Sequence, residues 1–269
     1  MLKDITLGQY FPGNSLLHRL DPRTKILCVI IYIAVVFCIK SFVGYGILAI
    51  FTALCVLCSR IPFGFVLKGL KPIMLFVAIT AVFNLFLTNG RVLWSWGFLT
   101  ITYEGVNLAI FMVLRLFFLV LGTSLLTLTT SPIVLTDGIE YLLSPFKKIG
   151  VPAHELAMMM TIALRFVPTL LEETEKIIKA QTARGADFES GNLLSRAKAM
   201  IPILIPLFVS AFRRADDLAM AMECRCYRGG EHRTRLRELR MGKCDIVGWS
   251  AILCLTVLVI LTNMIGFGI

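Results

Sequence analysis

The chain has 269 residues and a formal net charge of +10, with 57% hydrophobic and 16% charged residues. Soluble domains carry roughly 25% charged residues, so this balance and a mean hydropathy of +0.82 exclude an ordinary soluble domain. The cations cluster between apolar runs, as the positive-inside bias predicts for cytoplasmic loops, which argues against nucleic-acid binding. The composition therefore predicts an all-α polytopic membrane protein.

In chain order, a polar segment of residues 1–25 comes first and is predicted to lie in the cytoplasm. Near its end this segment contains Asp21-Pro22, which has the form of a helix cap followed by proline in the first turn. Apolar runs then predict about five transmembrane helices, at roughly 26–39, 42–58, 72–87, 106–128 and 245–269. Only Lys40 and Ser41 separate the first two spans, which predicts a tight helical hairpin. Residues 63–70 are apolar with cations at their edge and predict an interfacial helix.

The distribution of cations predicts the topology of these spans. With both the N-terminus and the segment 129–243 inside, 24 of the 27 Lys and Arg residues lie on the cytoplasmic side. The loop of residues 88–102 then lies outside, where Trp94 and Trp96 suit the membrane boundary, and the C-terminus also lies outside. Arg115 falls within a predicted span. A charged residue there is either a functional group or one member of a structural pair inside the bundle.

The long polar region predicts amphipathic helices in place of spans. A helix over 153–166 is expected to be interrupted by Pro168, and a second over 169–183 is too polar to cross a bilayer. A third is predicted from near Leu193 to Arg225. The predicted organisation is thus a cytoplasmic segment (1–25), a four-span bundle (26–128), a cytoplasmic region of long amphipathic coupling helices (129–243) and a C-terminal transmembrane helix (244–269).

Two arginines stand at the predicted helix ends of this region, each between small residues. The first lies in Ala183-Arg184-Gly185 and the second in Cys224-Arg225-Cys226, 41 positions later. A guanidinium is always charged and pairs bidentately with carboxylates, so an arginine at a helix tip suits insertion into an acidic groove of another protein. The alternative is an arginine held at a lipid phosphate or left in solvent.

With these motifs the chain resembles the T component of energy-coupling factor (ECF) transporters, the EcfT family. The resemblance covers nearly the whole chain in order and rests on five segments: Tyr10-Phe11-Pro12-Gly13-Asn14-Ser15, Leu17-His18-Arg19-Leu20-Asp21-Pro22-Arg23-Thr24-Lys25, Leu164-Arg165-Phe166-Val167-Pro168, Ala180-Gln181-Thr182-Ala183-Arg184-Gly185 and Ala221-Met222-Glu223-Cys224-Arg225-Cys226-Tyr227.

The resemblance implies a non-catalytic subunit of the cell membrane that couples two ABC-type ATPases, alike or different, to a substrate-binding S component. In the family, two coupling helices end in Ala-Arg-Gly motifs that dock in grooves on the ATPases. This assigns the two docking roles to Arg184 and Arg225. Cysteines replace the small residues of the second motif, so the helix is expected to end later, at Gly229-Gly230.

Vitamins or other micronutrients would be carried by the S component. A surface for that subunit is predicted on Met-rich and proline-bearing segments, with ordinary helix packing as the alternative. Its candidate residues are Met158, Met159, Met160, Met200, Pro202, Pro206, Met220 and Met222. ATP and Mg²⁺ are expected on the partner ATPases, because no phosphate-binding loop motif occurs in the sequence.

Two other classes of function are weighed against the coupling role. A permease with its own substrate path calls for facing polar groups in mid-membrane, and Arg115, Asn84 and Asn107 are the candidates. A membrane transferase or protease calls for a nucleophile–base pair or a metal cluster. The three histidines are widely separated and Cys224 and Cys226 have no partner pair at zinc spacing, so neither a catalytic nor a metal site is predicted.

Overall fold

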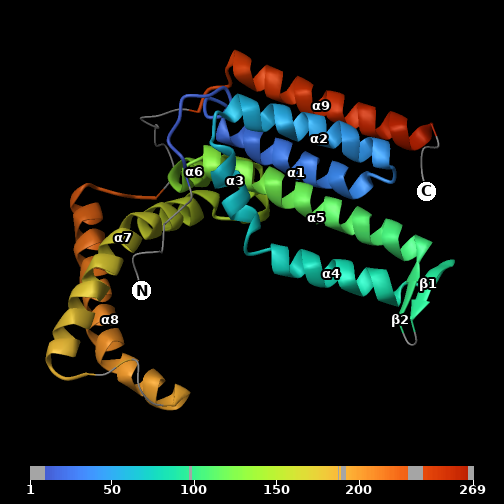
Figure 1. Cartoon of the computed structure of the whole chain (residues 1–269). Helices are drawn as coiled ribbons and strands as arrows, with labels where there is room; N and C mark the ends of the chain where they lie inside the picture. The colour runs from blue at the N-terminus through green and yellow to red at the C-terminus, as the bar shows by residue number, and fades with distance from the viewer. Residues whose placement is uncertain (1–9, 97–98, 187, 189–191, 230–238, 266–269) are drawn as a thin grey trace. The chain divides into compact units, whose positions relative to one another are not determined.

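The computed structural model describes residues 10–96, 99–186, 188, 192–229 and 239–265 (Figure 1). The chain forms two compact units. One, here called the membrane unit, is drawn from Gly8–Gly138 and Glu238–Ile269, and the other from Ile139–Arg237. The fold is that of an all-α polytopic membrane protein, with one short β-hairpin added to the helices.

Four helices pack together in the membrane unit. Both α1 (Pro22–Cys38) and α2 (Phe42–Ser59) pack on α5 (Tyr103–Thr129) and on α9 (Lys243–Met264). The short helices α3 (Phe63–Leu70) and α4 (Met74–Leu87) each pack on α5. These helices lie at the five predicted spans and the predicted interfacial helix, although α1 and α4 have only 17 and 14 residues.

Side-chain caps explain where several of these helices begin. The Asp21 carboxylate accepts a hydrogen bond from the Arg23 amide, with Pro22 in the first turn as predicted. Ser41 Oγ accepts from the Gly44 amide at 3.1 Å and starts α2, which confirms the tight hairpin after α1. Thr102 Oγ1 does the same for α5 by accepting from the Gly105 amide at 3.1 Å.

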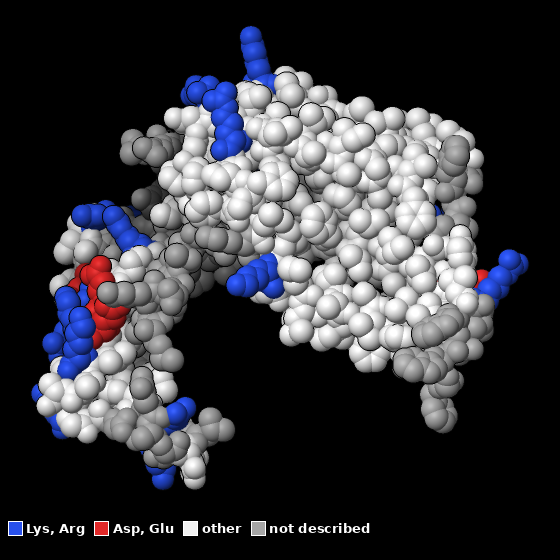
Figure 2. All heavy atoms as spheres, viewed as in Figure 1, with Lys and Arg blue, Asp and Glu red and all other residues white. Residues whose placement is uncertain are grey.

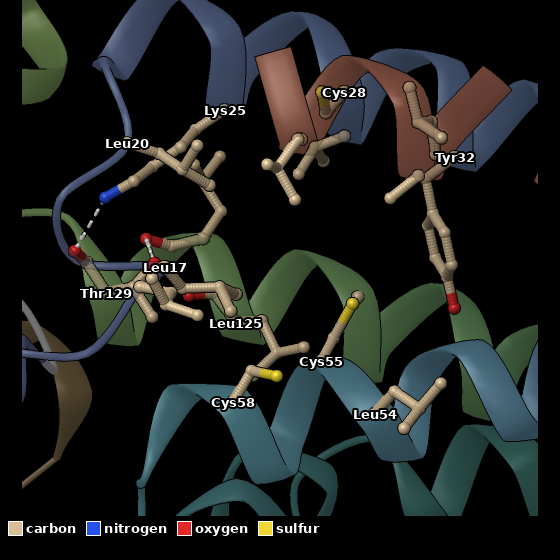
Figure 3. Close-up of a pocket in the computed structure, with 18 of the residues that line it drawn as sticks. Leu17, Leu20, Lys25, Cys28, Tyr32, Leu54, Cys55, Cys58, Leu125 and Thr129 are labelled. Atoms are coloured by element: carbon tan, nitrogen blue, oxygen red, sulfur yellow. Dashed lines mark hydrogen bonds between the residues drawn. The ribbon is translucent and has the colours of Figure 1, made fainter. Parts of the chain in front are cut away.

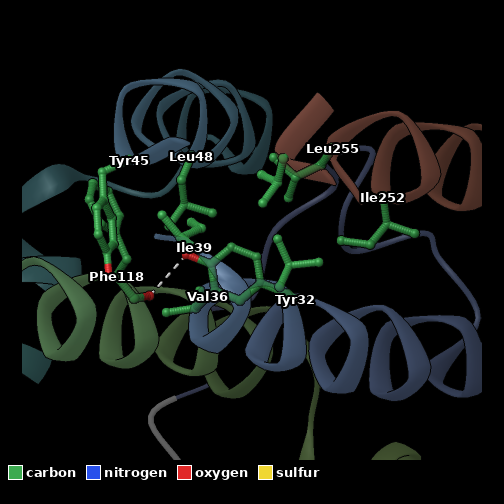
Figure 4. Close-up of a cluster of buried hydrophobic side chains, with 10 residues drawn as sticks. Tyr32, Val36, Ile39, Tyr45, Leu48, Phe118, Ile252 and Leu255 are labelled. Atoms are coloured by element: carbon green, nitrogen blue, oxygen red, sulfur yellow. Dashed lines mark hydrogen bonds between the residues drawn. The ribbon is translucent and has the colours of Figure 1, made fainter. Parts of the chain in front are cut away.

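Besides a smaller buried cluster that includes Val56, Leu121 and Leu125, a hydrophobic core lies among the four packed helices (Figure 4). Val36 and Leu48 are fully buried there, with Phe118 from α5 and Leu255 from α9 packed beside them. The Tyr32 hydroxyl donates to the Phe118 carbonyl at 3.0 Å, so the buried phenol keeps a polar partner.

Buried polar groups join the helix ends at the opposite end of the bundle. The Asp245 carboxylate accepts from the amides of Asp21 at 2.8 Å and Gly242 at 2.7 Å, which ties the start of α1 to the start of α9. Lys25 Nζ donates to the Thr129 carbonyl at 3.0 Å and the Thr130 hydroxyl at 3.1 Å, which ties α1 to the end of α5. The polar segment that contains Asp21 and Lys25 therefore holds the ends of α1, α5 and α9 together.

The loop expected over residues 88–102 contains an antiparallel hairpin of β1 (Val92–Trp96) and β2 (Leu99–Thr102). Thr102 Oγ1 donates to the Thr88 carbonyl at 2.8 Å and closes the base of the hairpin. Local alternation in this stretch is too short to predict the pairing, so the hairpin was not expected from the sequence.

The second unit is built on two long helices that cross, α7 (Ala153–Ala183) and α8 (Leu193–Cys224), here called the crossing pair (Figure 1). The chain enters this unit through α6 (Pro132–Leu143) and a 3₁₀ turn, η2 (Ser144–Ile149), that ends at Gly150. The predicted break at Pro168 is wrong, because α7 continues through it. Proline removes one amide donor from the interior of a helix, and α7, which packs on α8, accommodates that loss.

By length and composition, four helices of the described residues could cross a membrane: α2, α5, α7 and α9. The presence of α7 in this set differs from the sequence analysis, which assigned it to the cytoplasmic region. Its first half carries two charged residues, Glu155 and Arg165, whereas its second half carries five: Glu172, Glu173, Glu175, Lys176 and Lys179.

Candidate coupling site at two helix ends

The first arginine motif forms the end of α7. Arg184 is the capping residue, and Gly185 follows it with a φ of +89°. The Gly185 amide donates to the Thr182 carbonyl at 2.9 Å, and the Ala186 amide donates to the Gln181 carbonyl at 3.0 Å. This pair of bonds is a Schellman motif, in which a left-handed residue reverses the chain directly after the helix.

The second motif ends α8 with the same hydrogen bonds. Arg225 is the capping residue, the Cys226 amide donates to the Glu223 carbonyl at 2.8 Å, and the Tyr227 amide donates to the Met222 carbonyl at 3.0 Å. Cys226 takes the left-handed conformation with a φ of +54°. The expectation that this helix ends only at Gly229-Gly230 is therefore wrong, because Cys226 occupies the position that Gly185 holds in the first motif.

Both guanidinium groups are exposed and lack a partner within the described part of the chain. Arg184 and Arg225 have no ion pair or side-chain hydrogen bond there. Each stands at the carboxyl end of a helix, where the helix dipole favours a cation. Ala183 and Cys224 before them, and Gly185 and Cys226 after them, are small, so each guanidinium is free to enter a groove on another protein.

An ion pair joins the two helices where they cross. Arg214 Nη2 of α8 lies 2.9 Å from Glu173 Oε2 of α7. The Ser210 hydroxyl and then Arg214 lower the pKa of Glu173 by hydrogen bonding to its ionised carboxylate. Each member of the pair lies eleven residues before the capping arginine of its own helix. At a rise of 1.5 Å per residue, both tips are about 16 Å from the crossing.

A second contact ties the Arg184 end of α7 to α8. Gln181 Nε2 donates to the Pro202 carbonyl at 3.4 Å. In a regular helix this carbonyl would accept from the amide four residues later, but that residue is Pro206, which has no amide hydrogen. The two prolines of α8 therefore leave an acceptor open to a side chain of α7, three residues before Arg184.

The Met-rich candidates do not form one patch. Met200, Pro202 and Pro206 are exposed in the first half of α8, but Met220 lies twenty residues beyond Met200, about 30 Å along the helix. On α7, Met159 and Met160 are exposed, whereas Met158 is half-buried, as is Met222 on α8. The continuous exposed apolar surface on α8 instead comprises Met200, Ile201, Leu204, Ile205, Phe208, Val209 and Phe212.

Sequence reasoning missed the Glu173–Arg214 pair, although a signal for it was present. The two residues are 41 positions apart, the same spacing as Arg184 and Arg225. If two helices cross at the same distance from their carboxyl ends, the two residues at the crossing are separated by as many positions as the two residues at the ends. The spacing of Glu172 from Lys176 and of Glu175 from Lys179 favours ion pairs within α7, but such pairs connect one helix to itself and give no such information.

Arg115 lies inside α5, with its guanidinium carbon 5.6 Å from the centre of the Phe37 ring of α1. This distance is that of a cation–π contact between two helices of the bundle. The contact places Arg115 against α1, and both interpretations of this charge, a functional group and a structural pair, stay predictions. In the described part of the chain, no group of three His, Cys, Asp or Glu side chains is placed to hold a metal ion.

Replacing Cys226 with glycine is expected to stabilise the end of α8. A left-handed conformation costs a residue with a Cβ about 1–2 kcal/mol, and glycine escapes this cost. Hydrogen exchange of the Tyr227 amide should slow by roughly fivefold, which corresponds to about 1 kcal/mol. The reciprocal change, Gly185→Ala, should speed exchange of the Ala186 amide by a similar factor. Unchanged exchange in both variants would contradict the equivalence of the two motifs.

Known proteins resemble the chain over this whole arrangement. A family model described as CbiQ, cobalt transport protein, matches residues 13–236, which include both helix ends. The chain belongs to the CbiQ/EcfT family.

Three proteins named energy-coupling factor transporter transmembrane protein EcfT are close relatives. The protein from Ruminiclostridium cellulolyticum is 62% identical over 247 residues, covering 92% of each chain. Those from Clostridium kluyveri and Acidaminococcus fermentans are 60% identical, covering 96% of each chain.

Membership in this family identifies the chain as a transmembrane component of an energy-coupling factor transporter. The apolar helices of the membrane unit fit a multi-pass membrane protein. The relatives are named as transmembrane components, which is consistent with a non-catalytic subunit.

Proposed function

We propose that this chain couples two ABC-type ATPase subunits to a substrate-binding S component in an importer of vitamins or other micronutrients. The observation that carries the proposal is the pair of matching helix ends. Arg184 and Arg225 have the same backbone geometry, the same exposure and no partner within the described residues. Two equivalent cationic tips suit two equivalent acidic grooves, as a homodimer or a similar heterodimer of ATPases would present.

The crossing gives this arrangement a way to transmit motion. The two tips lie at equal distances from the Glu173–Arg214 pair, so a change in the separation of two bound ATPases would change the angle between α7 and α8. Packed helices transmit such movements because interfaces switch between discrete arrangements more readily than they deform. ATP and Mg²⁺ would be held by the partner subunits.

We place the protein in the cell membrane with the crossing pair and the N-terminus in the cytoplasm and the C-terminus outside. Cations support this orientation, since 17 of the 27 lie between Lys147 and Lys243. On the face seen in Figure 2, the middle of the membrane unit is uncharged, and its charged side chains lie near the ends. This is the distribution expected of a surface in contact with membrane lipids.

The exposed apolar surface over residues 200–212 of α8 is proposed as the platform for the S component. Phe208 and Phe212 are 59% and 68% exposed, although aromatic side chains are normally buried in a soluble helical unit. Among the candidates from the sequence, Met200, Pro202 and Pro206 lie within this part of α8. Met158, Met159 and Met220 stay candidates for a separate contact.

Substrate binding separates the coupling role from the permease alternative. The purified chain should capture both ATPase subunits and should bind no vitamin or transition-metal ion by itself, while the complex with an S component binds substrate. Equilibrium binding of radiolabelled micronutrients to the isolated chain in nanodiscs measures this. Saturable binding without an S component would favour a permease, with Asn84, Asn107 and Arg115 as the first residues to test.

A further inference from the structure

An apolar groove lies in the membrane unit, beside a buried cluster that includes Val56, Leu121 and Leu125 (Figure 3). Its volume is about 480 Å³, within the range of roughly 300–1,000 Å³ that is typical of small-molecule sites. The lining comes from α1, α2, α5, α9 and the segment before α1, and includes Leu17, Leu20, Cys28, Tyr32, Cys55 and Leu125.

Most polar groups that line the groove already have partners within the protein. Lys25 Nζ donates to the Thr129 carbonyl and the Thr130 hydroxyl, and Thr129 Oγ1 donates to the Leu125 carbonyl at 2.7 Å. Thr52 Oγ1 donates to the Leu48 carbonyl at 2.9 Å, and the Tyr32 hydroxyl to that of Phe118. A polar substrate would therefore find few groups to bind, whereas a hydrocarbon chain would be well accommodated.

The mouth of the groove lies among exposed side chains of α2 and α9. Leu54 and Cys58 of α2 and Val247 of α9 line the groove and are exposed, and the first and last of these are 55% and 65% accessible. Both helices are long and apolar enough to span the membrane. If α2 and α9 span the membrane, acyl chains surround them, and a mouth between their exposed side chains would open towards lipid.

Charge at the mouth favours an anionic headgroup. Lys243, at the start of α9, lines the groove and is exposed, with no ion pair or hydrogen bond among the described residues. Lys25 is the second lining cation, and none of the described residues that line the groove is a carboxylate. Arg60, which caps α2 two residues after Cys58, is also exposed.

We propose that this groove binds one acyl chain of an anionic glycerophospholipid, whose phosphate contacts Lys243. An acyl chain in the groove would give the apolar lining residues contact atoms that they otherwise lack. The positive charge of Lys243 would favour a lipid with a negative headgroup. The bound lipid would form part of the packed bundle between α2 and α9. The site is separate from the two arginine tips and does not depend on the coupling proposal.

Lipid retention tests the site. The full chain is reconstituted in vesicles of equal parts phosphatidylglycerol and phosphatidylcholine, extracted in detergent, washed and analysed by mass spectrometry for each lipid. The native chain should retain phosphatidylglycerol in preference. Cys55→Trp, which fills the groove, and Cys58→Trp, which obstructs its mouth at an exposed position, should lose most of this lipid. Cys254→Trp, at an exposed cysteine of α9 outside the groove, is the matched control.

The headgroup contact has its own variant. Lys243→Gln should reduce the preference for phosphatidylglycerol about fivefold, the effect of removing one cation near an anionic lipid. Lys40→Gln, at an exposed lysine outside the groove, should leave the preference unchanged. Equal retention by the native chain, Cys55→Trp and Cys58→Trp would overturn the proposal. Greater retention after deletion of residues 1–9 would assign the groove to that segment and would overturn it as well.

Discussion

Replacing Arg184 and Arg225 together with alanine is expected to abolish capture of the ATPase subunits. Truncating one member of a buried, charge-assisted contact costs about 2–5 kcal/mol, largely because the partner carboxylate stays desolvated and unpaired. At 1.4 kcal/mol per tenfold change, each arginine accounts for roughly 30-fold or more in affinity. Each single variant should keep one docking contact and show weakened capture, whereas the double variant should show none.

The control for this experiment is another exposed arginine on the same helix. Arg213 lies on α8 and is exposed, and it has no partner in the described part of the chain. Arg213→Ala should leave capture and transport close to those of the native chain. Because both tip arginines are exposed, the double variant should keep its helical content and its elution as a folded protein. Full capture and full transport by the double variant would refute the docking role and reopen the permease alternative.

Hydropathy and capping rules predicted the elements of this fold well. The start of α1 at Asp21-Pro22, the hairpin at Lys40-Ser41 and the helix over Phe63–Leu70 are each set by residues within a few positions of the boundary. A local signal of this kind can be read without knowledge of the tertiary structure. The same reasoning placed Arg184 and Arg225 at helix ends.

Two errors arose where tertiary packing or strain overrides a local preference. Pro168 has the intrinsic effect of breaking a helix, yet α7 runs through it along α8. Cys226 takes a left-handed conformation that favours glycine, so a search for glycine put the end of α8 three residues too late. A residue held against its preference at a proposed docking site is consistent with selection for the position of Arg225.

Local patterns in a single sequence do not specify contacts between distant segments, and for the Glu173–Arg214 pair the only hint is the shared spacing of 41 positions. The Glu173–Arg214 pair, the bond from Gln181 to the Pro202 carbonyl and the groove near Lys25 each depend on helices brought together by the fold. Hydropathy marks the residues of the groove as apolar and thus as core. Only their positions in the structure show that they line a groove.

The Glu173–Arg214 pair is expected to set the geometry of the crossing, and charge reversal tests this. Both side chains are partly exposed, so the attraction is worth up to about 1 kcal/mol. Arg214→Glu removes that attraction and adds a repulsion of similar size, for a total of about 2 kcal/mol. If both tips must reach their grooves together, this variant should bind the ATPase pair roughly 30-fold more weakly.

The exchange of the two charges distinguishes a positional role from a loss of fold. Glu173→Arg/Arg214→Glu restores the attraction with reversed sign and should recover most of the ATPase binding, whereas each single reversal should not. Arg213→Glu introduces the same acidic group next to position 214, and its expected effect is small. Binding to a single immobilised ATPase subunit should be nearly equal in all these variants, because one tip docks without regard to the other. Equal loss in the single reversals and the exchange would show that the pair does not determine the spacing of Arg184 and Arg225.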